Sequence, residues 1–281
     1  MNRLATTCLL ALLAAGGACK KDEVSTPTAT PEDVASLGDG AAEAGPTDPP
    51  QDPDPPELRA AFEAYLRGDP EAAVAALDPV LGTWEGDGRI RARAMGHALL
   101  ALARAEDVVE QAEPHARAAS EEAAKLHDPE VTAHARLAEG VFALGVEHFD
   151  DAVAALEAAA SAEAPAELRA LAQILLGQAR IGRAYGPGGG SKLLHPEDLD
   201  AARAAYEAAL ALADGTPTAA LLEGRAHEGL AAVAKYKGEH EALCEHAAKA
   251  SERLAAAEAT ERLREGPRLL AEAGRCEGAG G

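Results

Sequence analysis

Apolar residues recur at helical spacing from residue 57 to residue 276, and proline and glycine residues interrupt them at intervals. At Asp69-Pro70 and Asp128-Pro129 a capping side chain precedes a proline in the first helical turn, whereas Gly68 and Gly238 mark helix ends. The pattern predicts helices over 57–67, 70–82, 88–104, 107–126, 129–146, 149–162, 165–184, 196–214, 217–237, 239–264 and 267–276. Short connections make successive helices antiparallel neighbours.

Three details of this pattern can be checked directly. Pro114 lies inside the predicted helix 107–126, so this helix is expected to be kinked or to begin later. Gly266-Pro267 is expected to end the helix that precedes it. Trp84 is placed in a loop between Gly82 and Gly88.

The composition supports a purely helical domain. Hydrophobic residues make up 47% of the chain and aromatic residues only 3%, so the apolar content consists mainly of Ala, Leu and Val. Ala and Leu are strong helix formers, and runs of β-branched residues are absent from the sequence. The predicted fold class is therefore all-α, built from antiparallel helix pairs. The formal net charge of −21 argues against nucleic acid as a partner and against electrostatic docking on anionic lipid.

An internal repeat runs through these helices. One spacing of positions recurs several times, with small residues at its first and third positions in most copies, which lets two helices approach closely. The clearest copy is Gly140, Phe149, Ala152, Leu156 and Ala159. Further copies are Ala61, Pro70, Ala73, Leu77 and Val80; Ala231, His240, Leu243, Ala247 and Ala250; Gly177 with Leu199, Ala202, Tyr206 and Ala209; and, weakly, Gly96, Val108 and Ala112.

This pattern resembles the tetratricopeptide-repeat family over most of residues 57–250, although the family's aromatic residue near the start of the first helix is missing throughout. The resemblance implies a stack of helix pairs, an α-solenoid, that acts as a scaffold and binds peptides or partner domains on its concave face. The groove residues it implies are His134, Leu137, Val141, Gln178, Arg225, Glu228, Lys235 and Tyr236. For each of them a solvated helix face is the alternative. The family's Lys/Asn clamp for a terminal carboxylate is not evident.

The first residues have the layout of an export signal. Arg3 precedes a short apolar stretch, the small residues 16–18 follow it, and Cys19 comes next. This arrangement resembles the bacterial lipoprotein signal, which implies that residues 1–18 are removed and that Cys19 is lipidated. Plain secretion is the alternative, since residues 16–18 also suit ordinary signal cleavage. The stretch is shorter than the ~20 residues that span a bilayer.

Residues 19–56 follow as a Pro-rich acidic segment, predicted to be a disordered tether. Residues 57–276 form the repeat domain, and residues 277–281 are a flexible tail. Cys244 and Cys276 remain after export as an even pair in a disulfide-permissive compartment, so we expect a bond between them. Two free thiols are the alternative.

Motifs for catalysis or cofactor binding are weak, so the sequence predicts no enzyme, no cofactor and no metal. The glycine-rich stretch 186–190 is followed by Ser191-Lys192, whereas a phosphate-binding loop needs Lys before Ser or Thr and a preceding strand. This excludes a nucleotide. His240 and Cys244 lie one helical turn apart, but two ligands do not complete a zinc site. The other histidines are scattered along the chain.

Together these features predict a non-catalytic scaffold or adaptor of the bacterial cell envelope, held to a membrane by an N-terminal lipid. Its expected partners are one or more envelope proteins or peptides. The expected location is the outer membrane, with a secreted or soluble periplasmic protein as the alternative. Two other functions stay open: a small-ligand or glycan binder that uses the concave face, and an enzyme whose site is not visible as a motif.

Overall fold

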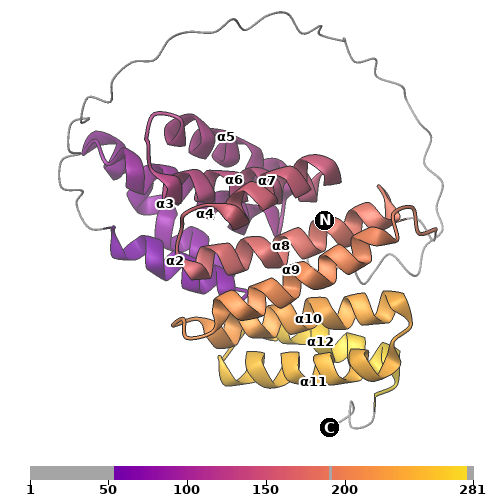
Figure 1. Cartoon of the computed structure of the whole chain (residues 1–281). Helices are drawn as coiled ribbons and strands as arrows, with labels where there is room; N and C mark the ends of the chain where they lie inside the picture. Colours follow the sequence, from indigo (N-terminus) through magenta and orange to yellow (C-terminus); the bar gives the residue numbers. More distant parts are fainter. Residues whose placement is uncertain (1–53, 190–191, 277–281) are drawn as a thin grey trace, which may run out of the picture.

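The structure, a computed structural model, describes residues 54–189 and 192–276, and all regular structure in these ranges is helical (Figure 1). The prediction of an all-α fold is therefore confirmed. The helices are α2 Pro56–Leu66, α3 Pro70–Gly86, α4 Ile90–Ala105, the 3₁₀ segment η1 Val109–Gln111, α5 Ala112–Ala123, α6 Pro129–Gly145, α7 Phe149–Ser161, α8 Ala166–Tyr185, α9 Glu197–Ala213, α10 Ala219–Lys237, α11 His240–Ala256 and α12 Glu261–Gly274.

The predicted capping residues begin the helices as expected. The Asp69 side chain accepts a hydrogen bond from the Ala72 amide at 2.9 Å. Asp128 likewise accepts from the amides of Glu130 and Val131, and a proline follows each of these aspartates in the first turn. The local sequence therefore fixes where α3 and α6 start.

Three boundary predictions were tested. Pro114 lies in the first turn of α5, so the predicted helix 107–126 does begin later, after η1. Trp84 was wrongly placed in a loop, because α3 continues to Gly86 and buries the indole to 4% exposure. Gly266-Pro267 was wrongly expected to end a helix: it lies inside α12, and the break instead falls between Ala256 and Glu261.

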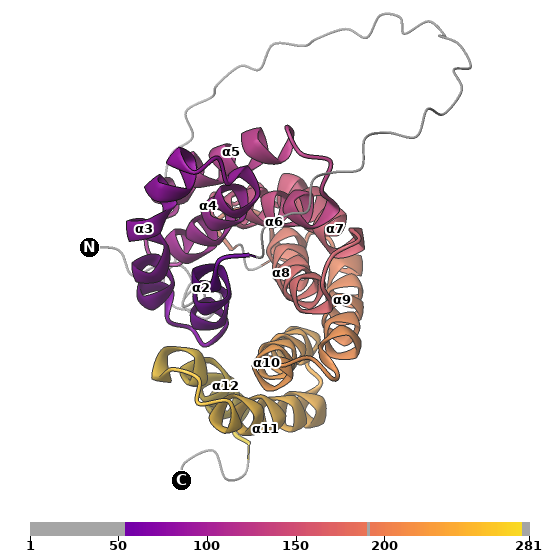
Figure 2. The same ribbon diagram turned by 90° about the vertical axis from the view of Figure 1, so that its left-hand side faces the viewer.

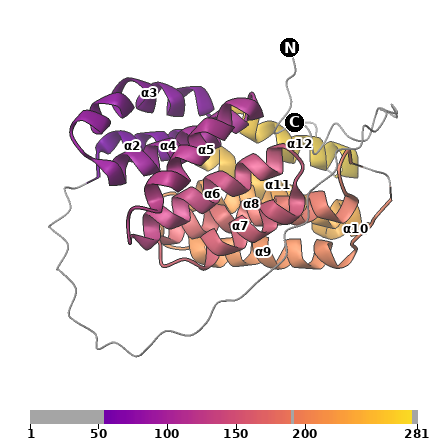
Figure 3. The same cartoon turned by 90° about the horizontal axis from the view of Figure 1, so that it is seen from above.

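The helices form two layers around a common centre. Each helix packs on the next one along the chain, and the even-numbered helices also contact one another in succession. Viewed from one end, α2, α4, α6, α8, α10 and α12 line the inside, and α3, α5, α7, α9 and α11 lie outside them (Figure 2). From above, α2 and α3 lie toward one end of the molecule (Figure 3).

Glycines on inner helices admit large side chains from outer helices. An ideal Cβ built at Gly140 would lie 2.5 Å from Leu156, and one built at Gly177 would lie 2.5 Å from Tyr206. Gly140 and Gly177 stand at the first position of the repeat spacing, where the sequence predicts a close approach of two helices, and that close approach is observed at both. The ring of Tyr206 also packs against α10, because an ideal Cβ built at Gly229 would lie closer than 3.0 Å to the ring.

The first and last helices of the described domain meet. The backbone amide of Thr260 donates to the carbonyl oxygen of Arg67 at 2.9 Å, and the Thr260 hydroxyl donates to that of Gly68 at 3.0 Å. Near the start of α2, Arg59 forms an ion pair with Glu167 at the start of α8, with 2.6 Å between Nη1 and Oε2. Glu167 also accepts a hydrogen bond from the hydroxyl of Thr218, just before α10. The row of inner helices thus closes on itself.

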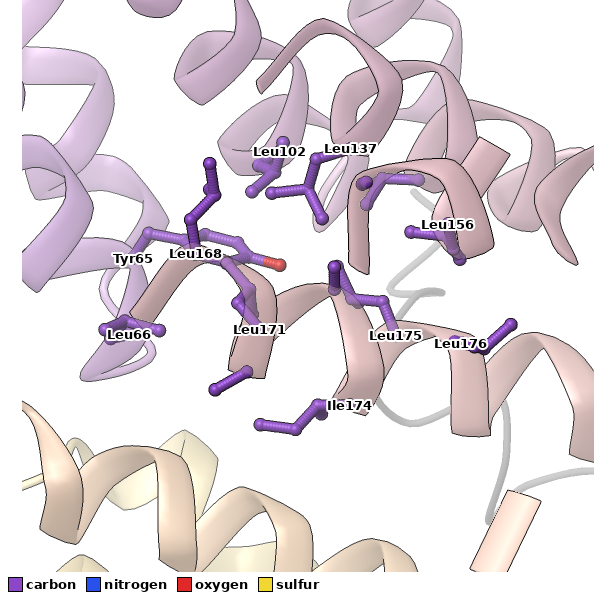
Figure 4. Packing of buried hydrophobic residues seen from close by; sticks show 14 of the residues in the cluster. Tyr65, Leu66, Leu102, Leu137, Leu156, Leu168, Leu171, Ile174, Leu175 and Leu176 are labelled. Atoms are coloured by element: carbon purple, nitrogen blue, oxygen red, sulfur yellow. The ribbon is translucent and has the colours of Figure 1, made fainter. Parts of the chain in front are cut away.

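Closure places an apolar core at the centre of the row. Tyr65 and Leu66 of α2 lie beside the leucines along α8 (Figure 4). Leu66, Leu137 and Leu171 are each 0% exposed. Burying each such side chain stabilises the fold by about 1.5–3 kcal/mol. Part of the inner face that a scaffold would offer to a partner is thus covered by the domain's own helices.

Candidate functional site

The eight residues proposed for partner binding divide into two groups. Leu137 is fully buried, and His134, Val141 and Arg225 are only 6–7% exposed. A partner cannot reach these four side chains in this arrangement, because the closing of the inner row covers them. The other four are partly exposed: Gln178, Glu228, Lys235 and Tyr236.

The buried His134 side chain makes a hydrogen bond within its own helix. Its Nδ1 lies 3.0 Å from the carbonyl oxygen of Glu130, one turn earlier in α6. Burial lowers the pKa of His134 to about 4, so the ring is neutral at neutral pH. Nδ1 therefore donates its proton to this carbonyl, and the side chain is a satisfied core histidine.

A polar cluster lies where α2, α4, α10 and α12 meet. The Arg225 guanidinium carbon lies 5.1 Å from the centre of the Tyr65 ring, a cation–π contact. Arg225 Nη1 is buried and has no hydrogen-bond partner within the described residues. Burial raises the pKa of Tyr65 to about 12 and that of Glu228 to about 7.

Such perturbed pKa values are frequent at catalytic sites, but the space at this cluster is small. The cavity beside Arg225, Tyr65 and Arg262 measures about 10 Å³. That volume is about enough for one water molecule. The cluster therefore has the geometry of an internal polar contact that joins four helices.

Two other tyrosines come together at the surface. The rings of Tyr185, which ends α8, and Tyr236, near the end of α10, lie 4.9 Å apart, and both are partly exposed. Lys235 lies beside Tyr236, and Leu193 and Leu194 of the connection to α9 are 36% and 50% exposed. We call Tyr185, Leu193, Leu194, Lys235 and Tyr236 the tyrosine patch.

Buried charge holds the tyrosine patch in place. Asp198, 2% exposed at the start of α9, binds Arg183 at 2.6 Å near the end of α8. The amide of Leu194 donates to the carbonyl oxygen of Ala184 at 2.7 Å, which fixes the connection against α8. Of the tyrosine patch, the family resemblance implied only Lys235 and Tyr236 as binding residues. Tyr185 was overlooked as a binding residue because it opens what appears in the sequence as a flexible insertion.

Histidines that are scattered in the sequence form two pairs. Nδ1 of His97 on α4 lies 3.0 Å from Nδ1 of His115 on α5. Nδ1 of His227 on α10 lies 3.2 Å from Nδ1 of His246 on α11. In each pair one ring donates and the other accepts, and burial lowers the pKa of all four. Within the described ranges no three His, Cys, Asp or Glu side chains are grouped as metal ligands.

The cysteines and the glycine-rich stretch are engaged within the chain. Cys244 and Cys276 form a disulfide, the pairing that the sequence suggests. His240 Nε2 lies 2.7 Å from the carbonyl oxygen of Gly274. The amide of Gly188 donates a hydrogen bond to the Glu147 carboxylate at 2.7 Å, so in the glycine-rich stretch this amide already binds a carboxylate of the chain itself.

Several predictions concern residues outside the described ranges. These are the signal 1–18, lipidation at Cys19, nearly all of the tether 19–56, and the tail 277–281. In the part of the chain that the structure describes, every helix is too short or too polar to cross a membrane. Comparisons with known protein families, with curated proteins and with solved structures found no match.

Proposed function

We propose that the chain is a lipid-anchored adaptor of the bacterial cell envelope, in which a tetratricopeptide-like α-solenoid binds a partner protein. The observation that supports it most is the tyrosine patch. Aromatic residues make up only 3% of the chain, and two of its tyrosines pair at the edge of the core, where both stay partly exposed. Tyrosines are enriched among the residues that dominate binding energy at protein interfaces.

The overall charge indicates the kind of partner. With a net charge of −21, the protein attracts a partner with a basic surface and repels other acidic proteins. Around the tyrosine patch the charges are largely compensated, since Lys237 pairs with Asp200 and Arg203 with Glu239. The net negative charge of the whole protein would then guide the approach, and the tyrosines and Leu194 would supply the apolar contact.

The anchor is tested separately from the binding. Cys19→Ser removes the thiol that would be lipidated, whereas Cys8→Ser changes a cysteine inside the proposed signal. We expect Cys19→Ser to move the protein from the membrane fraction to the soluble fraction, and Cys8→Ser to leave it with the membranes. Fractionation of cells and mass determination of the mature N-terminus provide the measurement. An unlipidated N-terminus in the wild-type protein would refute the anchor.

Partner binding is tested by crosslinking in intact cells and affinity purification of the full-length protein. We expect one dominant basic partner that is lost at least tenfold in Tyr185→Ser/Tyr236→Ser, because the paired rings form the apolar centre of the contact. Ile90→Ser is the matched control, since Ile90 is 36% exposed at the start of α4. Circular dichroism verifies the fold of each variant. Equal recovery by the double variant, or recovery of the protein alone, would reject the adaptor proposal.

A further inference from the structure

The last helix, α12, is the element that closes the inner row. Its capping residue Thr260 bonds to the end of α2, as described above. Its first turn is fixed by Arg262, which donates to the carbonyl oxygen of Glu106 at 3.0 Å and binds the Asp107 carboxylate at 3.4 Å. Leu263 packs against Gly68. Helix α12 thus bridges the two ends of the domain.

Yet α12 has little helical stability of its own. Gly266 and Pro267 lie in its middle, where glycine costs about 1 kcal/mol relative to alanine and proline removes a backbone hydrogen bond. Its buried side chains are Leu263, Pro267 and Leu270, a single stripe at positions i, i+4 and i+7. The helix therefore depends on the surface that it covers, and on the Cys244–Cys276 disulfide just beyond its C-terminal end.

The covered surface is selective for one kind of helix. A Cβ at Gly266 would lie closer than 3.0 Å to the carboxylate end of Glu228 of α10, so a larger residue at this position requires the flexible Glu228 side chain to move. A Cβ at Gly274 would lie 2.7 Å from Leu243 of α11, which sets a small position. Glu106 and Asp107 receive an arginine at the N-terminal turn. The site thus fits a helix with an apolar i, i+4, i+7 stripe, an arginine in its first turn and a small residue at its C-terminal end.

We propose that the surface beneath α12 is an exchangeable binding site for an amphipathic helix of a partner protein, and that the Cys244–Cys276 disulfide keeps α12 in it. The partner helix has the chemistry just described and binds by laying its apolar face into the site. The site uses residues distinct from those of the tyrosine patch. A dithiol reductant opens it: two electrons and two protons pass to Cys244 and Cys276, which become thiols, and the dithiol becomes a disulfide.

The reduced helix remains tethered to α11, so it competes with any added peptide at a high effective concentration. The test therefore uses the full chain with Leu263→Asp and Leu270→Asp, which weaken the hold of α12. The probe is a fluorescent peptide with the sequence of residues 260–275, and binding is followed by anisotropy. We expect binding at least tenfold tighter after reduction with dithiothreitol than before. The same peptide with Leu263→Asp and Leu270→Asp should bind at least tenfold more weakly, because it lacks the apolar stripe that the site buries.

Equal binding in the two redox states, or equal binding of the Leu263→Asp/Leu270→Asp peptide, would overturn the proposal. A second measurement uses the wild-type chain, in case the double variant does not fold. Trypsin should cleave after Arg264 and Arg268 of α12 at least tenfold faster once the disulfide is reduced, while cleavage after the exposed Arg117 of α5 stays unchanged. Unchanged cleavage in α12, or accelerated cleavage at both places, would equally reject an exchangeable helix.

Discussion

Replacing Gly229 with valine is expected to destabilise the domain by roughly 1–3 kcal/mol, because the new side chain would overlap the ring of Tyr206. The ring is 1% exposed and cannot move aside, since Gly177 closes its other side at 2.5 Å from an added Cβ. Valine is a better helix former than glycine, so the loss is steric and is not one of helix propensity. Urea unfolding followed by circular dichroism measures the loss.

A matched control separates the steric effect from helix propensity. Gly82 lies within α3, and an added Cβ there meets no atom within 4 Å. Gly82→Ala should therefore stabilise the domain by up to about 1 kcal/mol, because alanine is the better helix former. Adding Tyr206→Ala to Gly229→Val should cost less than the sum of the two single changes. Strict additivity would show that Gly229 and Tyr206 do not press on each other.

His134 should make the domain sensitive to acid. Its pKa is about 4 in the folded state, compared with about 6.5 in an unfolded chain. Between these pH values the unfolded chain binds a proton at His134 that the folded chain does not bind. The contribution of neutral His134 to the unfolding free energy is therefore fully present above pH 6.5 and is lost as the pH falls toward 4. The difference of about 2.5 pKa units corresponds to about 3 kcal/mol.

The measurement is the change in unfolding free energy between pH 7 and pH 4 for the wild-type protein and for His134→Leu, which cannot titrate. We expect the wild type to lose about 3 kcal/mol more than the variant. Glu228 acts in the opposite direction in both proteins, because its pKa is raised to about 7 and its stabilising contribution is lost as the pH rises. His148→Gln, at an exposed position, is the control. Equal slopes for wild type and His134→Leu would contradict the assignment.

The sequence predicts that small residues of the repeat spacing let two helices approach closely. The structure shows which side chains fill the space beside them: Leu156 lies against Gly140, and Tyr206 lies against Gly177 and Gly229. The spacing alone did not predict these individual contacts. The contact of Thr260 with Gly68 was not predicted either, since it joins residues 192 positions apart and no local pattern encodes it.

The candidate site was harder to predict for the same reason. A spacing pattern shows which side chains face inward, but not whether the interior stays open. Leu137 and Arg225 do face inward, and closure of the row buries them. The histidine pairs were missed because each pair joins two helices at positions unrelated to the repeat spacing. The disulfide could be predicted from the sequence, since Cys244 and Cys276 are the only cysteines after the proposed signal and Cys19.

The junction between Thr260 and the end of α2 bears on how the domain is made and how it fails. An open row of helix pairs can assemble progressively and fray from either end, since each pair touches only its neighbours. Here the C-terminal end of α2 is covered by Thr260, which lies 192 residues after Gly68. Contacts between residues so far apart in sequence slow folding. Once formed, the closed row has no loose terminal pair from which unravelling can start, and it is expected to unfold as one cooperative unit.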